Sequence, residues 1–425
     1  MQNRYDLIIY GATGFAGSVA TRHLMESSDL NGMRVAIAGR NKQKLEDLQK
    51  LCKFKPDIII ADSNDTDSVE SMVQNTKVVL NFAGPFAKYA EPVIAACAKL
   101  GTHYLDITGE TAFTRAMIDR YQEQAKKSGA RLVPFCGFDS VPADLTTYLA
   151  LKIASEHKLK LDELCLCYQI KGGLNGGSLA TALNMAENNT FMMPDSNILI
   201  SDKNWPKELE ASRSPRYEPT FSRWSAFFHM GPTNNAVVRR SAWLRSHLHE
   251  SKSESEPVFH YEERLLMPKN YGFIHACLTT CFVKGFGLLS STAIGRELIR
   301  WCYGLKPGQG PTEKERLAGY FHVQLVGRSS GHDKLKISME RKGDPSNETT
   351  SALAIECARL MVANDFATEE KGFLTPSVAF GMSLFEHLKT AGFHFKTEIV
   401  DQELVHQMQE TNGATQLSYS SPGRF

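Results

Sequence analysis

The stretch LIIYGATGFAG, residues 7–17, decides the fold of the first part of this 425-residue chain. Its four leading apolar residues predict a buried strand, and the glycine turn after them opens a helical stretch that reaches about Glu26. Glycine is needed for a tight strand-to-helix turn, for close approach of backbone amides to a pyrophosphate, and for packing of the helix on the sheet. The triplet therefore predicts dinucleotide binding, with a purely structural turn as the alternative. The cofactor residues expected here are Gly11, Thr13, Gly14, Phe15 and Gly17.

The end of the second expected strand indicates which dinucleotide binds. An NAD enzyme usually carries a carboxylate there for the ribose 2′-hydroxyl, whereas this chain has Arg40 and Asn41, with Lys44 one turn later. A carboxylate would repel a 2′-phosphate, and a guanidinium pairs with it and stacks on the adenine. We therefore expect NADP(H) as the cofactor, with NAD(H) less favoured. The alternative is that Arg40 and the lysines are the solvated start of a helix.

Residues 1–150 alternate short apolar runs with longer helical patterns. Such alternation predicts a Rossmann-type parallel sheet covered by helices on both faces. The expected strands are residues 7–10, 34–38, 57–61, 78–82, 104–107 and 131–135. The fold class is α/β, with an α+β second domain after the sheet.

Polar side chains follow the later strands, and parallel sheets bind ligands beyond the carboxyl ends of their strands. Asp62 is expected to contact the adenine side or to cap a helix. Residues expected along the pyrophosphate towards the nicotinamide are Asn81, Ala83, Gly84 and Pro85. Residues expected to face the substrate after the fifth and sixth strands are Asp106, Glu110 and Ser140, with Asp139 beside them. Asp139 or Ser140 can equally cap the next helix.

The second half of the chain carries weaker patterns. A glycine-rich turn at residues 172–177, with Asn175 and Ser178, predicts a wall of the substrate cleft or a tight connection. Residues 191–270 show little periodicity and predict a lid or binding loop, within which residues 262–264 (Glu-Glu-Arg) are expected on a solvated face. Residues 271–290 predict a buried helix, with a surface-seated amphipathic segment, touching lipid or a membrane, as the alternative. Later residues predict a strand hairpin at 322–340 and helices at 351–362 and 377–391.

The composition excludes several classes of function. The chain has 48 Lys and Arg against 47 Asp and Glu, a net charge of +1, which gives no basic field for nucleic acid. Its nine cysteines form no CxxC pair, so neither a disulfide scaffold nor a metal site is expected. These features predict a cytoplasmic protein without a transmembrane span, in peripheral contact with a membrane if its apolar segment lies on the surface.

Several motifs in order resemble the saccharopine dehydrogenase-like oxidoreductases, in particular the trans-acting enoyl reductase subfamily. The matching stretches in the first half are GATGFAG (11–17), AGRNKQKL (38–45), the stretch NFAGPF to DITGE (81–110) and GFDSVPADL (137–145). Those in the second half are GGLNGGSLAT (172–181), LKPGQGPTEKER (305–316), GDP (343–345) and the stretch TPSVAFG to GFHF (375–395).

The resemblance implies a domain order and a chemistry. The expected domains are an NAD(P)-binding Rossmann domain at 1–150, an α+β substrate or dimerisation domain at 151–374, and a C-terminal segment at 375–425 that packs back on the first domain. The implied activity is hydride transfer by an NADP(H)-dependent reductase, of enoyl or carbonyl type, on a small-molecule or acyl-type lipid substrate. A homodimer is a further expectation for the assembly.

Hydride transfer also needs a group that supplies a proton or polarises the acceptor oxygen. Tyr89, just beyond the Gly84-Pro85 turn, and Asp139 are the catalytic candidates; a tyrosine packed at the domain interface is the alternative for Tyr89. Because no single acid stands out in the sequence, a dinucleotide-binding protein without turnover, serving as a sensor or lipid-associated scaffold, stays open as the second function.

Overall fold

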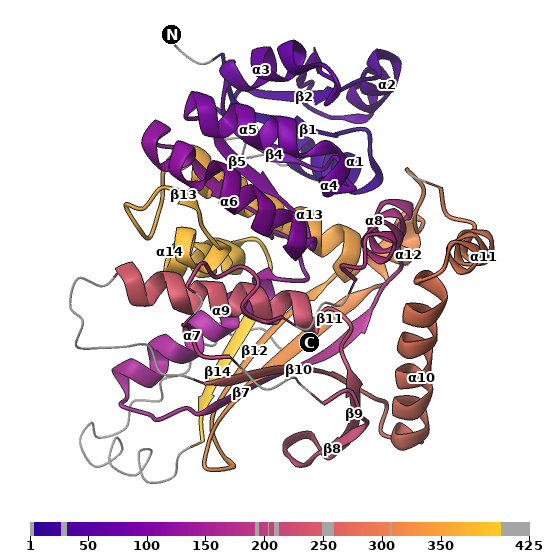
Figure 1. Ribbon diagram of the computed structural model, residues 1–425, viewed down its shortest axis with the longest axis vertical. Coiled ribbons are helices and arrows are strands. Elements are labelled where there is room, and N and C mark those ends of the chain that lie inside the picture. The colour runs from indigo at the N-terminus through magenta and orange to yellow at the C-terminus, as the bar shows by residue number, and fades with distance from the viewer. Residues whose placement is uncertain are drawn as a thin grey trace.

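The structure is a computed structural model that describes residues 4–26, 32–191, 195–202, 204–207, 212–248, 259–306 and 308–400. Its first layer is a parallel sheet with the strand order β13-β6-β5-β4-β1-β2-β3 (Figure 1). The strands are β1 (Tyr5–Tyr10), β2 (Val35–Gly39), β3 (Asp57–Ile60), β4 (Thr76–Asn81), β5 (His103–Asp106), β6 (Arg131–Val133) and β13 (Gly372–Phe373). The central strand β1 is buried along its whole length because β4 and β2 flank it and helices cover both faces. The predicted Rossmann-type sheet is confirmed.

Helices follow these strands as the alternating pattern predicts. They are α1 (Phe15–Glu26), α2 (Lys42–Leu51), α3 (Thr66–Gln74), α4 (Phe86–Tyr89), α5 (Glu91–Leu100) and α6 (Thr111–Ser128). Helices α5 and α6 each end at a glycine in the left-handed conformation, Gly101 (φ 78°) and Gly129 (φ 87°), which other residues rarely adopt. These two glycines are local signals that end the helices.

The second layer is a mixed sheet with the order β14-β12-β11-β7-β10-β9-β8. Its strands are β7 (Glu163–Lys171), β8 (Arg216–Glu218), β9 (Arg223–Phe227), β10 (His260–Leu266), β11 (Tyr320–Ser329), β12 (His332–Lys342) and β14 (His394–Ile399). The helices after α6 are α7 (Val141–Glu156), α8 (Gly176–Glu187), α9 (Gly231–Leu248), α10 (Gly272–Ser290), α11 (Ala293–Tyr303), α12 (Glu313–Leu317), α13 (Thr350–Ala363) and α14 (Pro376–Thr390). The expected β11–β12 hairpin and the two late helices are confirmed.

Residues 191–270 contain regular structure that the sequence pattern did not reveal. Strands β8, β9 and β10 and the 18-residue helix α9 lie in this region, so the expectation of an irregular lid is wrong for the described part of it. The polar stretch 249–258, expected as a loop, lies outside the described residues. Strand β10 lies between β7 and β9, and this pairing, not local periodicity, makes it a strand.

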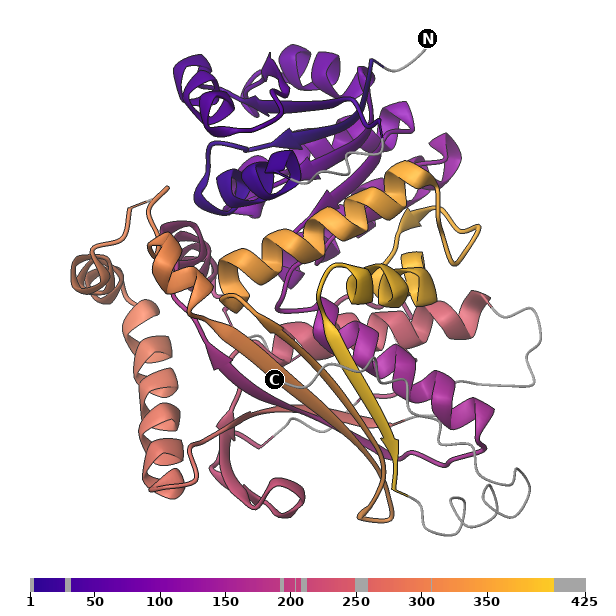
Figure 2. The ribbon, with the colours of Figure 1, turned by 180° about the vertical axis from the view of Figure 1, so that it is seen from behind.

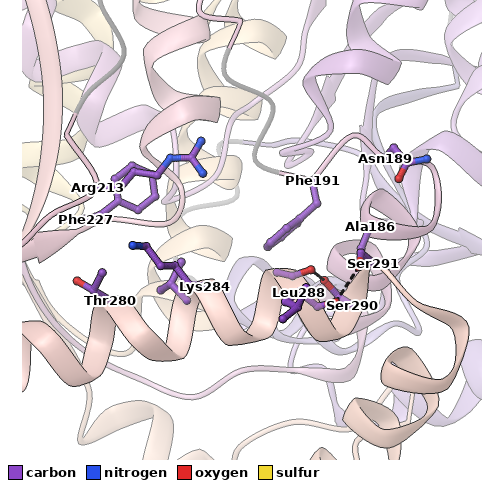
Figure 3. A pocket seen from close by; sticks show the side chains of 12 residues that line it. Ala186, Asn189, Phe191, Arg213, Phe227, Thr280, Lys284, Leu288, Ser290 and Ser291 are labelled. Atoms are coloured by element: carbon purple, nitrogen blue, oxygen red, sulfur yellow. Dashed lines mark hydrogen bonds between the residues drawn. The ribbon is translucent and has the colours of Figure 1, made fainter.

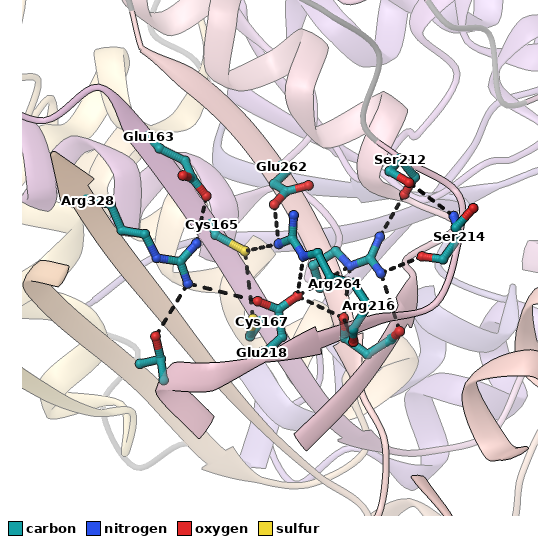
Figure 4. A network of polar contacts seen from close by, with 12 residues as sticks. Glu163, Cys165, Cys167, Ser212, Ser214, Arg216, Glu218, Glu262, Arg264 and Arg328 are labelled. Atoms are coloured by element: carbon teal, nitrogen blue, oxygen red, sulfur yellow. Dashed lines mark hydrogen bonds and ion pairs between the residues drawn. The ribbon is translucent and has the colours of Figure 1, made fainter. Parts of the chain in front are cut away.

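Charged residues of β10 are buried, contrary to the expected solvated face. Glu262, Glu263 and Arg264 are each less than 5% exposed. The guanidinium of Arg264 donates to Ser225 Oγ at 3.0 Å and to the carbonyl of Ser214 at 2.7 Å. Figure 4 shows how a network of opposite charges surrounds this strand, through Arg216, Glu218, Arg328 and Glu163. A buried charge is tolerated when it is paired and hydrogen-bonded, which a single sequence does not reveal.

The chain returns to the first domain earlier than the sequence placed it. Helix α13 packs on α1 and against β4 and β5, and β13 pairs with β6 in parallel. After β13, α14 packs on α7 and α13, and β14 pairs with β12 in the second sheet (Figure 2). Within the described residues, the segment after 375 therefore joins the second sheet, and residues 350–373 make the return.

Helix α10 lies on the surface and is not the expected buried helix. Most of its large apolar side chains are exposed, with Leu278 at 63% and Phe282 at 61%. It runs with α11 along one edge of the molecule and packs on β9 at the edge of the second sheet (Figure 1). Among the described residues it is the one helix whose length and apolar composition would allow it to cross a membrane.

Candidate functional site

At two positions, the glycine turn at the carboxyl end of β1 leaves no room for a side chain. Gly11 has a φ of 72°, and a Cβ built on it would lie 2.6 Å from the backbone nitrogen of Ala83. A Cβ on Gly17 would lie 2.4 Å from the carbonyl oxygen of Gly11. A Cβ on Gly14 would lie 3.2 Å from the same oxygen, which is tight but less severe. The backbone is thereby left open at the amino end of α1, where a pyrophosphate binds.

A loop of the second domain covers this turn. The ring of Phe15 packs so closely on Gly310 that a Cβ there would lie 2.5 Å from it, and the Arg316 guanidinium lies 5.6 Å from its centroid. The amide of Gly176 at the start of α8 donates to the carbonyl of Gln309 at 2.8 Å. The dinucleotide turn is therefore enclosed by residues from both halves of the chain.

The expected 2′-phosphate end is open to solvent. Arg40, Asn41 and Lys44 are exposed, and Asn41 caps α2 by accepting the amide of Lys44 at 3.0 Å. Among the described residues no ion pair engages Arg40, so its guanidinium is available for a phosphate. Asp62 accepts the amide of Asn64 at 3.0 Å within a turn, but the N-cap of α3 is Asp65, so the capping alternative is wrong and the adenine contact stays a prediction.

Asn81 shapes the loop after β4. Its side chain accepts the amide of Ala83 at 2.8 Å and donates to the hydroxyl of Tyr104 at 3.0 Å. A Cβ on Gly84 would lie 3.6 Å from Thr181 Oγ1 of α8, so α8 covers this loop as well. Tyr89 ends the short helix α4 that follows Pro85, and it is half-buried.

The two carboxylates after β5 are engaged inside the first domain. Asp106 accepts the Tyr104 hydroxyl at 2.8 Å and the amides of Thr108 and Phe135, and burial raises its pKa to about 7. Glu110 accepts the two amides at the start of α4 at 2.7 and 3.1 Å. Both side chains are almost fully buried, so these contacts favour positioning of the loops over the expected contact with substrate.

Asp139 is different, because its side chain is exposed to solvent although the surrounding protein desolvates the carboxyl. No hydrogen bond to its carboxylate is found in the described part of the chain, and desolvation raises its pKa to about 6. It lies in the loop between β6 and α7, beyond the carboxyl end of the sheet. A carboxylate that is desolvated and unpaired in a cleft is a typical functional group. The neighbouring Ser140 is buried and donates to Asn234 at 3.2 Å.

Polar residues of the second domain lie near Asp139. Glu263 of β10 accepts hydrogen bonds from Tyr168 at 3.0 Å, Tyr261 at 2.7 Å and Asn234 at 2.9 Å. Burial, together with the nearby Asp139 carboxylate, raises the pKa of Glu263 to about 8. Glu263 therefore holds a proton at neutral pH, and it lies close enough to Asp139 for their charges to interact.

A second polar side chain to consider is that of His229, in the turn before α9. Its side chain is solvent-exposed, yet the surrounding protein lowers its pKa, so the imidazole is neutral at neutral pH. The next residue, Met230, reaches the loop after β5, where a Cβ on Gly109 would lie 3.3 Å from its methyl group. The start of α9 thus meets the first sheet beside Asp139. Nothing in the weakly periodic stretch 191–270 indicated His229, Asn234 or Glu263 as site residues.

The glycine-rich turn before α8 has structural contacts of its own. Asn175 is buried, accepts the amide of Ser178 at 2.9 Å and donates to Asn347 at 2.8 Å. Asn347 in turn donates to Asp344 at 2.6 Å. The contacts of Asn175 favour the tight-connection alternative, while Ser178, half-buried on the first turn of α8, stays a predicted substrate contact. No cluster of three metal-ligating side chains is found among the described residues.

Known proteins resemble the chain in sequence over nearly all its length. The family of saccharopine dehydrogenase NADP-binding domains matches residues 7–133, which run from β1 to β6. The trans-acting enoyl reductase of Mycobacterium ulcerans is 31% identical over 419 residues, covering 92% of this chain and 97% of the relative. A trans-acting enoyl reductase of Mycobacterium tuberculosis is 30% identical over 420 residues, with the same shares.

Solved structures share the fold at low sequence identity. Saccharopine dehydrogenase (L-Glu forming) from Saccharomyces cerevisiae covers 93% of this chain and 100% of its own, with a TM-score of 0.54 and 12% identity. The homospermidine synthase of Legionella pneumophila, solved in complex with NAD, has the same TM-score and identity and covers 94% of this chain and 92% of its own. The chain therefore belongs to the saccharopine dehydrogenase-like oxidoreductases, in the group of the trans-acting enoyl reductases, and its first domain is an NADP-binding domain.

Proposed function

We propose that this protein is an NADP(H)-dependent reductase that reduces an enoyl or carbonyl group of an acyl-type, lipid-like substrate. The observation that carries the proposal is the Asp139 carboxyl in the loop between β6 and α7, which has no hydrogen-bond partner among the described residues and whose pKa desolvation raises to about 6. It lies beyond the carboxyl ends of β5 and β6, where a sheet of this type holds the reactive end of its dinucleotide. The names of the relatives support the enoyl type.

The chain's own residues divide the work as follows. The glycine turn and Arg40 hold the dinucleotide, which supplies the hydride when bound. Protonated Asp139 would give its proton to one carbon of the substrate double bond, or to the oxygen of a carbonyl, while the other carbon would take up the hydride. The hydroxyls of Tyr168 and Tyr261 both donate to Glu263, and these hydrogen bonds fix the three side chains near Asp139. Tyr89 stays the alternative proton donor.

The reaction is tested by following NADPH oxidation with α,β-unsaturated acyl thioesters of increasing chain length, with saturated thioesters and simple ketones as controls. We expect turnover with the unsaturated thioesters alone, or with carbonyl substrates if the reductase is of that type. Tight NADPH binding without turnover on any of these substrates would instead favour the non-catalytic sensor or scaffold.

Arg40→Ala is expected to reduce the preference for NADPH over NADH by about 10- to 100-fold, because a charge-assisted pair with the 2′-phosphate is lost. The affinity for NADH should change little. Titration of intrinsic fluorescence with both nucleotides measures the effect, and Arg4→Ala, an exposed arginine at the start of β1 that pairs with Asp57, is the matched control. Equal weakening of NADH and NADPH would show that Arg40 does not recognise the phosphate.

We further propose that the protein is cytoplasmic and touches a membrane surface through α10 and α11. Besides Leu278 and Phe282, the exposed apolar side chains on this face include Ile294 at 85% and Trp301 at 80%. Contiguous apolar surface of this kind marks an interaction site with lipid or protein. A homodimer that covers the same face is the alternative.

The double variant Leu278→Asp/Phe282→Asp is expected to abolish flotation with phosphatidylcholine vesicles. The reason is that two carboxylates would have to leave water on binding. Leu51→Asp, an equally exposed leucine at the end of α2, is the control and should float as the wild type does. Flotation of the double variant would contradict the proposal, and a wild-type dimer that this variant dissolves, seen by size-exclusion chromatography with light scattering, would favour the homodimer.

A further inference from the structure

A pocket of about 510 Å³ lies between α10, the end of α8 and strand β9, away from the dinucleotide turn. Its volume is in the range of pockets that hold small molecules. Its apolar lining includes Phe191, Phe227 and Leu288, and its cations are Arg213 and Lys284. In Figure 3, Arg213, Phe227 and Lys284 gather at one end, Leu288 lies at the other, and the ring of Phe191 points inward. The pocket is therefore amphipathic.

The two cations are the only charged groups in the described lining, where Asn189 adds a neutral amide. The pocket hydroxyls are already used, since Thr280 donates to the Ala276 carbonyl at 2.8 Å and Ser290 to the Gly287 carbonyl at 3.1 Å. No carboxylate lines the pocket, and no ion pair engages Arg213 or Lys284 within the described residues. The Arg213 guanidinium stacks on the Phe227 ring at 5.5 Å, which holds it at this end of the pocket. As far as the described residues go, the pocket thus has two cations without an opposing carboxylate beside an apolar wall.

The pocket also adjoins the proposed membrane face. Leu288 lines the pocket and is 74% exposed, so it belongs to both surfaces. Lys284 lies one turn before it on the same helix. A lipid whose chain lies along α10 would bring its headgroup to these cations.

We propose that this pocket binds the anionic headgroup of a phospholipid, with the phosphate between Arg213 and Lys284 and the upper acyl chain against Phe191 and Leu288. The inference rests on the proposed membrane contact and not on reductase activity. It assigns α10 two separate functions: its apolar face gives affinity for any bilayer, and the pocket gives preference for anionic lipid.

The test is flotation of the full chain with phosphatidylcholine vesicles, with and without added phosphatidic acid. We expect phosphatidic acid to strengthen wild-type binding. In Arg213→Gln/Lys284→Gln, the affinity for vesicles that contain phosphatidic acid should fall about 5-fold for each cation removed. The same variant should bind pure phosphatidylcholine as the wild type does, and Lys284→Arg should keep the preference. Lys126→Gln/Lys127→Gln, which removes two exposed cations at the end of α6, is the charge-matched control.

Each result separates the pocket from its alternatives. An unchanged preference in the Arg213/Lys284 variant, or an equal loss in the α6 control, would overturn the pocket, because binding would then follow overall charge. Equal wild-type binding to both vesicles, together with binding of inorganic phosphate that Arg213→Gln/Lys284→Gln removes, would show that the site takes a free phosphate and no lipid. Failure of the wild type to float with either vesicle would overturn the membrane contact together with the pocket, while leaving the reductase proposal intact.

Discussion

Replacing Asp139 by asparagine is expected to lower kcat by about 10²- to 10⁴-fold while leaving NADPH affinity unchanged. Asparagine has nearly the same shape but cannot give up a proton to the substrate. The fold should tolerate it because no hydrogen bond to this carboxylate is found among the described residues, and removal of a desolvated carboxyl leaves no partner unpaired. Thermal unfolding of the variant measures that tolerance.

The pH dependence of kcat identifies the role of Asp139. Its pKa is raised to about 6, so the protonated form dominates below that pH and declines above it. If the protonated form is the proton donor, kcat should be level below about pH 6 and fall about tenfold for each further pH unit. The residual activity of Asp139→Asn should lack this slope.

Tyr89→Phe is the matched comparison, since it removes the other proton-donor candidate. A loss of turnover in Tyr89→Phe with normal turnover in Asp139→Asn would transfer the role to Tyr89 and contradict the assignment made here. If both variants were as active as the wild type, neither residue would be the proton donor, and Glu263 would be the next residue to replace.

Gly11→Ala is expected to weaken NADPH binding by more than about 100-fold. The added Cβ would lie 2.6 Å from the amide nitrogen of Ala83 at a φ of 72°, so the turn must move away from the position that a pyrophosphate needs. Strain of this kind also costs about 1–3 kcal/mol of stability. Fluorescence titration with NADPH and thermal unfolding measure the two effects.

Gly285→Ala on α10 is the control for this substitution. Nothing lies within 4 Å of its added Cβ, and alanine favours the helix, so stability should hold or rise slightly. Normal NADPH affinity in a folded Gly11→Ala protein would show that the glycine turn is structural only, and the reductase proposal would fall with it.

The first sheet could be predicted because its information is local. Each strand is a short apolar run, each helix has its own stop such as Gly101, and burial on both faces makes that pattern continuous. The second sheet depends on pairings between distant segments. Strand β10 is bounded by β7 and β9, and its acidic and basic residues are tolerated because Arg216 and other partners come from elsewhere in the chain.

The same division runs through the candidate site. The sequence predicted the glycine turn, Arg40 and the loops after β4 to β6. Each of these directly follows a strand that the sequence shows as a short apolar run. The sequence did not distinguish Asp106 and Glu110, whose hydrogen bonds fix neighbouring loops, from Asp139, whose carboxylate accepts no hydrogen bond in the described structure. That distinction depends on which amides and hydroxyls lie within hydrogen-bond distance, and so on the packing of loops far apart in the sequence.

The sequence by itself determined the Rossmann-type sheet, its NADP-binding domain and the family, since these rest on local patterns and ordered motifs. Only the tertiary structure decided that Glu263 lies near Asp139, that Asn234 joins Glu263 to Ser140, and that α10 is exposed. An apolar helix has the same composition whether protein or lipid covers it, and a carboxylate has the same letter whether paired or free. Burial and partners, which three-dimensional packing alone sets, make the difference.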